Sequence, residues 1–158
     1  KMARVIYVTQ EGLKKLKENL EQLINIERPK ISKQIGEAIE KGDITENAEY
    51  DAAKDAQGLL EAKIASLKNK IAHARIIDKS KIDTSQVKIL NKVTIRNRKN
   101  NTIMKYTIVP DSEANLKEAK IAVSTPIAQG LIGKKVGDVV EIKVPAGIIS
   151  FEIMDISL

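Results

Sequence analysis

The chain has 158 residues, 42% of them hydrophobic, and a net charge of +6 from 27 lysines and arginines against 21 aspartates and glutamates. It has no cysteine and one histidine, His73, which excludes disulfides, thiolate metal sites, a histidine-based zinc site and a Ser–His–Asp triad. With one phenylalanine and no tryptophan, the core must be aliphatic, and an aromatic ligand pocket or base-stacking surface is disfavoured.

Apolar residues recur at helical spacing across residues 11–75, in two arms separated by a glycine. The second arm repeats at intervals of four and three, a narrow stripe typical of two helices packed on each other. Gly42 interrupts the pattern, and glycine is favoured just past a helix end. The spacing predicts an antiparallel coiled-coil hairpin with its turn at residues 42–45 and a kink or restart at Pro29. The repeating positions are Leu13, Leu16, Leu20, Leu23, Ile31, Ile35 and Ala38, then Ala53, Gln57, Leu60, Ile64, Leu67, Ile71 and Ala74.

The second half of the chain changes to short runs rich in β-branched residues. Residues 79–86 are polar without an apolar face, which predicts a linker between a hairpin domain at 1–78 and a second domain at 87–158. Hairpin turns are expected at residues 99–102 and 145–147. We expect an α+β domain with an antiparallel sheet. Its strands are predicted at residues 92–98, 104–109, 120–123, 139–144 and 148–156, with one short helix at 126–132.

Charge is divided unevenly between the two halves. Residues 1–78 hold 14 basic and 13 acidic side chains, whereas residues 79–158 hold 13 and 8. A basic second domain suits an acidic partner surface or nucleic acid, although lysine-rich surfaces are often only solubilising. Because no apolar run approaches about 18 residues and the N-terminus lacks a signal-peptide pattern, we expect a cytoplasmic protein that does not enter membranes.

The stretch GDITENAEYDAAKDAQ, residues 42–57, gathers acids within this basic chain. Asp43 and Glu46 have the spacing of a capping box, in which an N-cap side chain and a glutamate three residues later satisfy the start of a helix. Glu49 and Asp51 would then complement the positive end of the helix dipole. From spacing alone, capping is the simpler interpretation of the acids.

The position of Asp43 and Glu46 allows a second interpretation. The turn of a long hairpin lies far from any core, so its side chains are free to serve another molecule. Two carboxylates three residues apart could hold Mg²⁺, which usually takes one or two protein carboxylates together with water or phosphate oxygens. Two ligands are too few for a tight site, so a partner or substrate would have to supply the others.

The same stretch closely resembles the tip motif of the bacterial GreA/GreB transcript cleavage factors, G-D-(L/I)-x-E-N-A-E-Y-x-A-A-(R/K)-x-x-Q. Residues 124–142, STPIAQGLIGKKVGDVVEI, resemble the family's S-P-I-(A/G)-x-(A/G)-L-(I/L)-G-K segment. Residues 145–153, PAGIISFEI, resemble its P-x-G-x-x-x-(F/Y)-E-(I/V) ending. The resemblance runs essentially end to end and is weakest in the linker. Ile39 and Glu40 stand where relatives often have arginine, which favours the GreA type over the more basic GreB type.

The resemblance implies two domains, an N-terminal coiled-coil hairpin and a C-terminal FKBP-like domain that docks on bacterial RNA polymerase at the mouth of its secondary channel. The hairpin would enter the channel, where Asp43 and Glu46 would help to hold a second Mg²⁺ and its attacking water. Backtracked RNA would then be cut near its 3′ end. The protein would be an accessory factor without nuclease activity of its own, acting as a monomer and holding no metal in isolation.

Further residues carry over from the family motif one at a time. Asn47 and Tyr50 would support the tip or contact RNA, although Tyr50 could simply pack beside the helical seam. Lys54 and Lys41 would contribute to a basic patch that contacts RNA, although a lysine at a helix C-terminus is also an ordinary partner of the helix dipole.

Three residues of the second domain, Ser124, Pro126 and Ile127, match the segment expected to dock on the polymerase. Their alternative role is to form a turn and short helix of the fold. Two other functions remain open at this point. An anti-Gre inhibitor would use the same scaffold to block the channel, and a coiled-coil chaperone or tether would use the tip acids only as helix caps.

Overall fold

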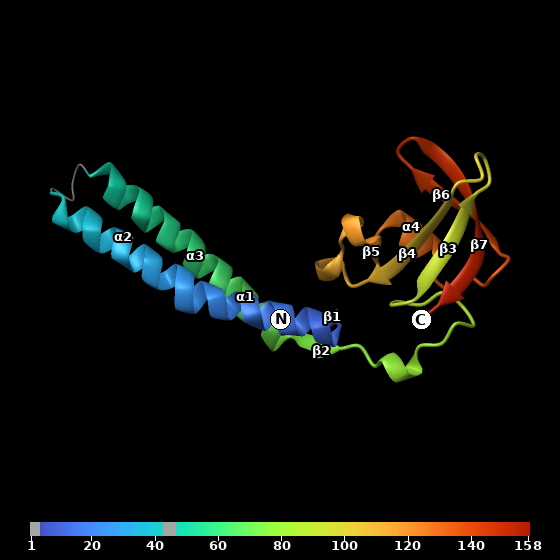
Figure 1. Ribbon diagram of the computed structural model, residues 1–158, viewed down its shortest axis with the longest axis horizontal. Coiled ribbons are helices and arrows are strands. Elements are labelled where there is room, and N and C mark those ends of the chain that lie inside the picture. Colours follow the sequence, from blue (N-terminus) through green and yellow to red (C-terminus); the bar gives the residue numbers. More distant parts are fainter. Residues whose placement is uncertain (1–3, 43–46) are drawn as a thin grey trace. The chain divides into compact units, whose positions relative to one another are not determined.

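The computed structural model describes residues 4–42 and 47–158 and divides the chain into two compact units, Lys1–Ile76 and Ile77–Leu158. Each unit has its own architecture (Figure 1). Among the helices in the described residues, none combines the length and hydrophobicity needed to cross a bilayer.

The first unit is built on the antiparallel helical hairpin that the apolar spacing predicts. The first arm consists of α1, Gln10–Gln22, a π-helical segment, Leu23–Glu27, and α2, Arg28–Glu40. The second arm is α3, Ala48–Ala72, which lies alongside the first (Figure 1).

The interruption expected at Pro29 is a widened helical turn and not a break. Proline has no backbone N–H, so the ordinary bond to the carbonyl four residues earlier is lost. In the preceding turn the Arg28 N–H bonds to the carbonyl of Leu23, five residues back, as in a π-helix. The first arm therefore continues through Pro29 with a local change of pitch.

The side chains buried between the two arms differ in size along the hairpin. Ala38 and Ala53 are its buried residues near the closing end, and Leu60 and Ile64 are buried farther along α3. The small alanine side chains let the arms approach each other closely at that end. The other predicted seam positions that the structure describes are half-buried, as expected for a two-helix interface that is open to water on both sides.

A short parallel pair of strands, β1, Ile6–Val8, and β2, Ala74–Ile76, lies at the open end of the hairpin. The sequence pattern did not predict it, because three residues are too few to display a strand period. Val8 is buried there, and the Ile6 N–H donates to the carbonyl of His73 at 2.9 Å. The pair ties the two chain ends of the hairpin together.

The second unit contains a five-stranded sheet of order β5-β4-β3-β7-β6 and one short helix (Figure 1). All five predicted strands and the helix are confirmed, and each end either agrees with the prediction or differs from it by one residue. The bounds are β3 Lys92–Asn97, β4 Ile103–Val109, β5 Lys120–Ala122, α4 Pro126–Leu131, β6 Val139–Val144 and β7 Gly147–Ser157.

The predicted antiparallel sheet is confirmed except at one edge. β5 pairs with β4 in parallel, so the sheet is mixed. The connection between these strands contains two 3-10 turns, Asp111–Glu113 and Leu116–Glu118, and it returns the chain to run in the original direction. The hairpin pairings of β3 with β4 and of β6 with β7 are antiparallel, as expected.

One cluster of buried side chains forms the core of this unit. It is aliphatic except for Phe151, as the composition requires. Its members are Val87, Val93, Ile95, Ile108, Ile121, Ala128, Leu131, Val140, Ile142, Phe151, Ile153 and Ile156.

A buried asparagine anchors the chain that leads into the sheet. Asn91 is 0% exposed, and its Oδ1 accepts from the Lys88 N–H at 2.7 Å. Its Nδ2 donates to the carbonyls of Asp83, at 3.0 Å, and Ser157, at 3.4 Å. The side chain thus joins the segment before β3 to the last residue of β7.

Candidate functional site

The first arm ends at Lys41, with Gly42 following it at a φ of +145°, a backbone conformation that favours glycine. The N–H groups of Lys41 and Gly42 bond to the carbonyls of Ala38, at 3.3 Å, and Ile39, at 3.4 Å. These bonds span three residues, so the last turn of α2 is tightened. Asp43 and Glu46, the two carboxylates predicted to act at the tip, lie outside the described residues.

The second arm begins with Asn47 as the N-cap of α3. Its Oδ1 accepts from the N–H groups of Glu49 and Tyr50, both at 3.1 Å. Its Nδ2 donates to the carbonyl of Ala38 on α2 at 2.6 Å. One side chain therefore caps one helix and binds the end of the other.

This geometry corrects the capping box inferred from Asp43 and Glu46. That pattern would start the helix at Asp43, whereas α3 starts four residues later with Asn47 as its cap. Asparagine is among the preferred N-cap residues, and its carbonyl oxygen reaches two of the free N–H groups. The N-cap of α3 is therefore Asn47 and not Asp43.

Charged side chains also connect the two arms at this end. Glu49 and Asp51 lie in the first turn of α3, where they complement the helix dipole as expected. Lys41 Nζ lies 3.0 Å from Glu49 Oε2, and both side chains are well exposed. In this structure Lys41, which was expected in an RNA-binding patch, binds the acid of the opposite arm.

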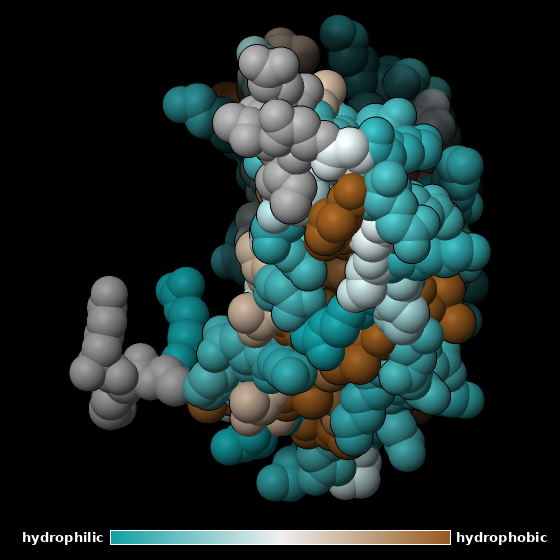
Figure 2. All heavy atoms as spheres, turned by 90° about the vertical axis from the view of Figure 1, so that its left-hand side faces the viewer, coloured by the Kyte–Doolittle hydropathy of each residue, from teal (hydrophilic) through white to brown (hydrophobic). Residues whose placement is uncertain are grey.

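Lys54 and Tyr50 lie on the first two turns of α3. Lys54 is exposed, and its Nζ donates to Gln57 Oε1 at 3.0 Å, whereas Tyr50 is half-buried. Figure 2 views the molecule from the closing end of the hairpin and shows a mostly hydrophilic surface, with hydrophobic atoms in separate small areas. Such a surface is suited to polar partners more than to an apolar ligand.

The described residues do not form a metal centre by themselves. Within residues 4–42 and 47–158, no group of three or more histidine, cysteine, aspartate or glutamate side chains could hold an ion. Asp43 and Glu46 would add two carboxylates, the donors that Mg²⁺ prefers, to the closing end. Two carboxylates would be a partial donor set for Mg²⁺, and another molecule would have to supply the remaining ligands.

The segment expected to dock on a partner forms the start of α4. Thr125 is the N-cap, and its Oγ1 accepts from the Ala128 N–H at 3.2 Å. Ser124 and Pro126 are exposed, whereas Ile127 is half-buried and packs against the core. The segment thus serves the fold through its cap and Ile127, and it presents Ser124 and Pro126 to solvent.

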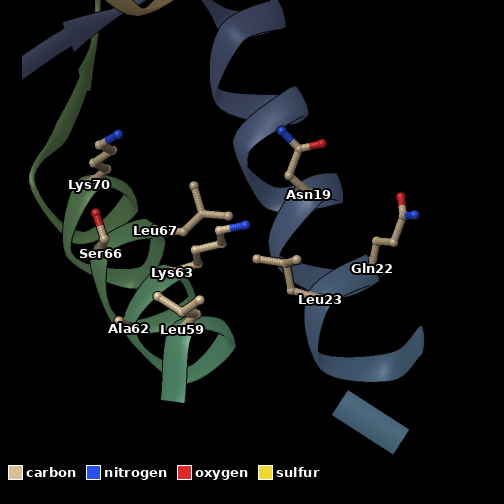
Figure 3. A pocket seen from close by; sticks show the side chains of 9 residues that line it. All are labelled: Asn19, Gln22, Leu23, Leu59, Ala62, Lys63, Ser66, Leu67 and Lys70. Carbon is tan, nitrogen blue, oxygen red and sulfur yellow. The ribbon is translucent and has the colours of Figure 1, made fainter. Parts of the chain in front are cut away.

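A groove lies on the hairpin between α1 with the π-helical segment and α3, and in it Leu23, Leu67 and Lys63 extend into the space between the arms (Figure 3). No carboxylate is among its lining residues, so it lacks the protein donors that Mg²⁺ prefers. The described part of the chain places it away from the closing end, and we assign it no chemistry. Its lining residues are Asn19, Gln22, Leu23, Leu59, Ala62, Lys63, Ser66, Leu67 and Lys70.

Known proteins resemble this chain over nearly its whole length. Family profiles described as "Transcription elongation factor, N-terminal" and "Transcription elongation factor, GreA/GreB, C-term" match residues 6–76 and 82–158. The transcription elongation factor GreA of Flavobacterium johnsoniae is 54% identical over 156 residues, which cover 99% of each chain. The GreA of Amoebophilus asiaticus is 51% identical over 156 residues, again 99% of each chain.

Among solved structures, Thermus aquaticus Gfh1 aligns with 99% of this chain and 100% of its own, at 25% identity and a TM-score of 0.45. The assignment of the chain does not depend on that likeness, because the two profiles and the relatives above half identity are sufficient. The chain belongs to the GreA/GreB family of transcription elongation factors and is of the GreA type.

Proposed function

We propose that this GreA-type factor stimulates RNA polymerase to cleave backtracked RNA, and that Asp43 and Glu46 are the residues of the chain that take part in the chemistry. The observation that carries this proposal is the cap of α3. Because Asn47 fills that role, helix capping does not account for the two acids between Gly42 and Asn47.

In this proposal the carboxylates of Asp43 and Glu46 supply one part of a site for a second Mg²⁺. Asp43 and Glu46 would hold this Mg²⁺, which when bound would lower the pKa of an attacking water and stabilise developing negative charge. Acids of the polymerase and phosphate oxygens of the RNA complete the ligand set, because two carboxylates do not suffice for a tight site. The protein is accordingly an accessory that completes the active site of its partner and is not a nuclease by itself.

In the sequence, the two acids stand in the segment that connects the arms of the hairpin. They lie between the ends of two helices of 13 and 25 residues, α2 and α3. Lys54 is exposed on the second turn of α3, and in this proposal it contacts the RNA backbone. Lys41 becomes available to RNA only if it exchanges its contact with Glu49 for a phosphate.

The second unit provides the docking surface on the polymerase in this proposal. Ser124 and Pro126 are exposed at the start of α4, and Ile127 supports them from the core side. The excess of basic residues in 79–158 suits an acidic surface on the polymerase. A monomer of the factor, one per polymerase, is sufficient for this arrangement.

Adding the wild-type protein to a stalled, backtracked elongation complex tests the proposal. We expect faster release of the 3′ RNA fragment, and no cleavage of the same RNA when polymerase is omitted. Slower cleavage in its presence would instead identify an anti-Gre inhibitor that blocks the channel. Failure to bind polymerase in a pull-down would favour a chaperone or tether.

A further inference from the structure

We propose that Asn47 is a positioning residue for the cleavage reaction, and that it acts by joining α2 to α3 and not by contacting RNA. This inference rests on the proposed function of the tip acids. Asn47 follows Glu46 directly, and its side chain holds the end of α3 against the end of α2.

The orientation of the Asn47 amide follows from its partners. The N–H groups of Glu49 and Tyr50 need an acceptor, so the atom facing them is the carbonyl oxygen Oδ1. The carbonyl of Ala38 needs a donor, so the atom facing it is Nδ2. Reversing the amide would lose all three hydrogen bonds at once.

Few other side chains could make both connections from this position. Aspartate can cap the helix, but when ionised it has no proton to donate to Ala38. Serine can also cap the helix, but its single oxygen is too close to the backbone to span the distance to α2. Asparagine carries an acceptor and a donor on one carbon, which meets both needs.

The acceptor of the Asn47 Nδ2 hydrogen bond, the carbonyl of Ala38, is equally well defined. Ala38 is 2% exposed, and its carbonyl also accepts from the Lys41 N–H at 3.3 Å as α2 ends. The alanine side chain leaves room for α3 to approach this turn. The contact is therefore part-buried, whereas the second connection between the arms, from Lys41 to Glu49, is an exposed ion pair that salt weakens.

The hydrogen bond from Asn47 to Ala38 also affects residues 43–46, which connect the two helices in the sequence. The first arm ends at the C-cap Lys41 and the second begins at the N-cap Asn47, so the hydrogen bond from Asn47 to Ala38 holds together the two helix ends between which Asp43 and Glu46 stand in the sequence. Fixing the ends of a short loop reduces the number of conformations it can adopt. Less ordering is then needed when the two carboxylates take up a metal with the polymerase.

The test uses Asn47→Asp and Asn47→Ser, which keep a capping oxygen and lose the donor to Ala38. Spin labels on cysteines introduced at the exposed residues Glu40 and Asp55 report the distance between the arms, since the chain has no cysteine of its own. We expect a narrow distance distribution for wild type and broader ones for both variants. The matched control is Asn115→Asp, which makes the same change at the N-cap of Leu116–Glu118 in the other unit.

The second readout is cleavage of backtracked RNA at increasing Mg²⁺ with polymerase saturated by factor. Both Asn47 variants should need about fivefold more Mg²⁺ for half-maximal cleavage, as expected for the loss of one neutral hydrogen bond. Their affinity for polymerase should stay within about twofold of wild type, because the docking residues lie in the second unit.

Three outcomes would contradict the inference. If both Asn47 variants kept the wild-type distance distribution and the wild-type Mg²⁺ requirement, Asn47 would not be joining the two arms. Impaired cleavage with unchanged distances would instead show that Asn47 contacts RNA directly. A wild-type protein that fails to stimulate cleavage would overturn the proposed function and with it the positioning role.

Discussion

The two units of this chain obtain their stability in different ways. The second unit packs a mixed sheet around one cluster of twelve buried side chains. The described residues of the first unit bury few apolar side chains, among them Val8, Ala38, Ala53, Leu60 and Ile64. The hairpin therefore depends more on helix caps and on cross-links between its arms than on a packed core.

The largest loss of stability is expected when a buried side chain is removed from the core of the second unit. Ile153 is 0% exposed in β7, which pairs with both β3 and β6. We expect Ile153→Ala to lower the free energy of unfolding of this unit by about 3–4 kcal/mol, because it leaves a cavity. Hydrogen exchange should rise in residues 92–157 and stay unchanged in α2 and α3. Equal loss of protection in both units would show that they unfold together.

Removing the buried amide of Asn91 should have the next largest effect. Asn91→Ala leaves the Lys88 N–H and the Asp83 carbonyl without their partner, so we expect a loss of about 2 kcal/mol. Denaturant unfolding followed on the second unit measures it. Asn91→Asp keeps only the acceptor and should also lower the free energy of unfolding relative to wild type. An alanine variant as stable as wild type would contradict the anchoring role.

The cap at the start of α1 tests how strongly the hairpin depends on such local hydrogen bonds. Thr9 Oγ1 accepts from the Gly12 N–H at 2.9 Å at the start of α1. Thr9→Ala should destabilise the hairpin by about 1 kcal/mol, measured by the thermal loss of helical circular dichroism. Thr9→Ser retains the oxygen and serves as the control. Equal melting temperatures for Thr9→Ala and Thr9→Ser would show that loss of the capping hydrogen bond does not cause the destabilisation.

The smallest effect is expected from the ion pair between the arms. Arg28 donates from Nε and Nη2 to Glu61 at 3.0 and 2.8 Å, and these hydrogen bonds hold the pKa of Glu61 below its ordinary value of 4.5. A lowered carboxylate pKa stabilises the folded state above that ordinary value, and the stabilisation is lost as pH falls through the folded-state pKa.

Glu61→Gln should therefore melt slightly below wild type at pH 7, and the difference should disappear as the pH falls through the folded-state pKa of Glu61. Since the pair is exposed, added salt should shrink the difference at pH 7. A difference that persists in acid would mean that the glutamine disturbs packing and not charge.

Much of this architecture could be predicted from apolar spacing. The hairpin arms, the five strands of the second unit and the helix at α4 all followed from periodicity, because burial on one face imposes it. The parallel pairing of β5 with β4 did not follow, since strand direction depends on how the connection folds back. The β1–β2 pair was missed because its strands have three residues each.

The candidate site was only partly predictable. The acids and Asn47 stood out by motif, but the helix start was placed at Asp43, because a capping-box pattern there competed with the true cap at Asn47. Asparagine followed by Ala48 and Glu49 is itself an N-terminal signal, and it could have located the cap. The Ala38 carbonyl could not be found from sequence, since it depends on how the arms meet.

The central claim is that the acids enclosed by the hairpin, and not acids elsewhere on it, serve the reaction. The most direct measurement is the single-turnover rate of RNA cleavage in a backtracked complex saturated with wild-type factor, with Asp43→Asn or with Asp51→Asn. Asp51 is the matched control, an exposed aspartate in the first turn of α3. We predict that Asp43→Asn lowers the rate to that of polymerase alone, and that Asp51→Asn retains stimulation. Full stimulation by Asp43→Asn would contradict the account.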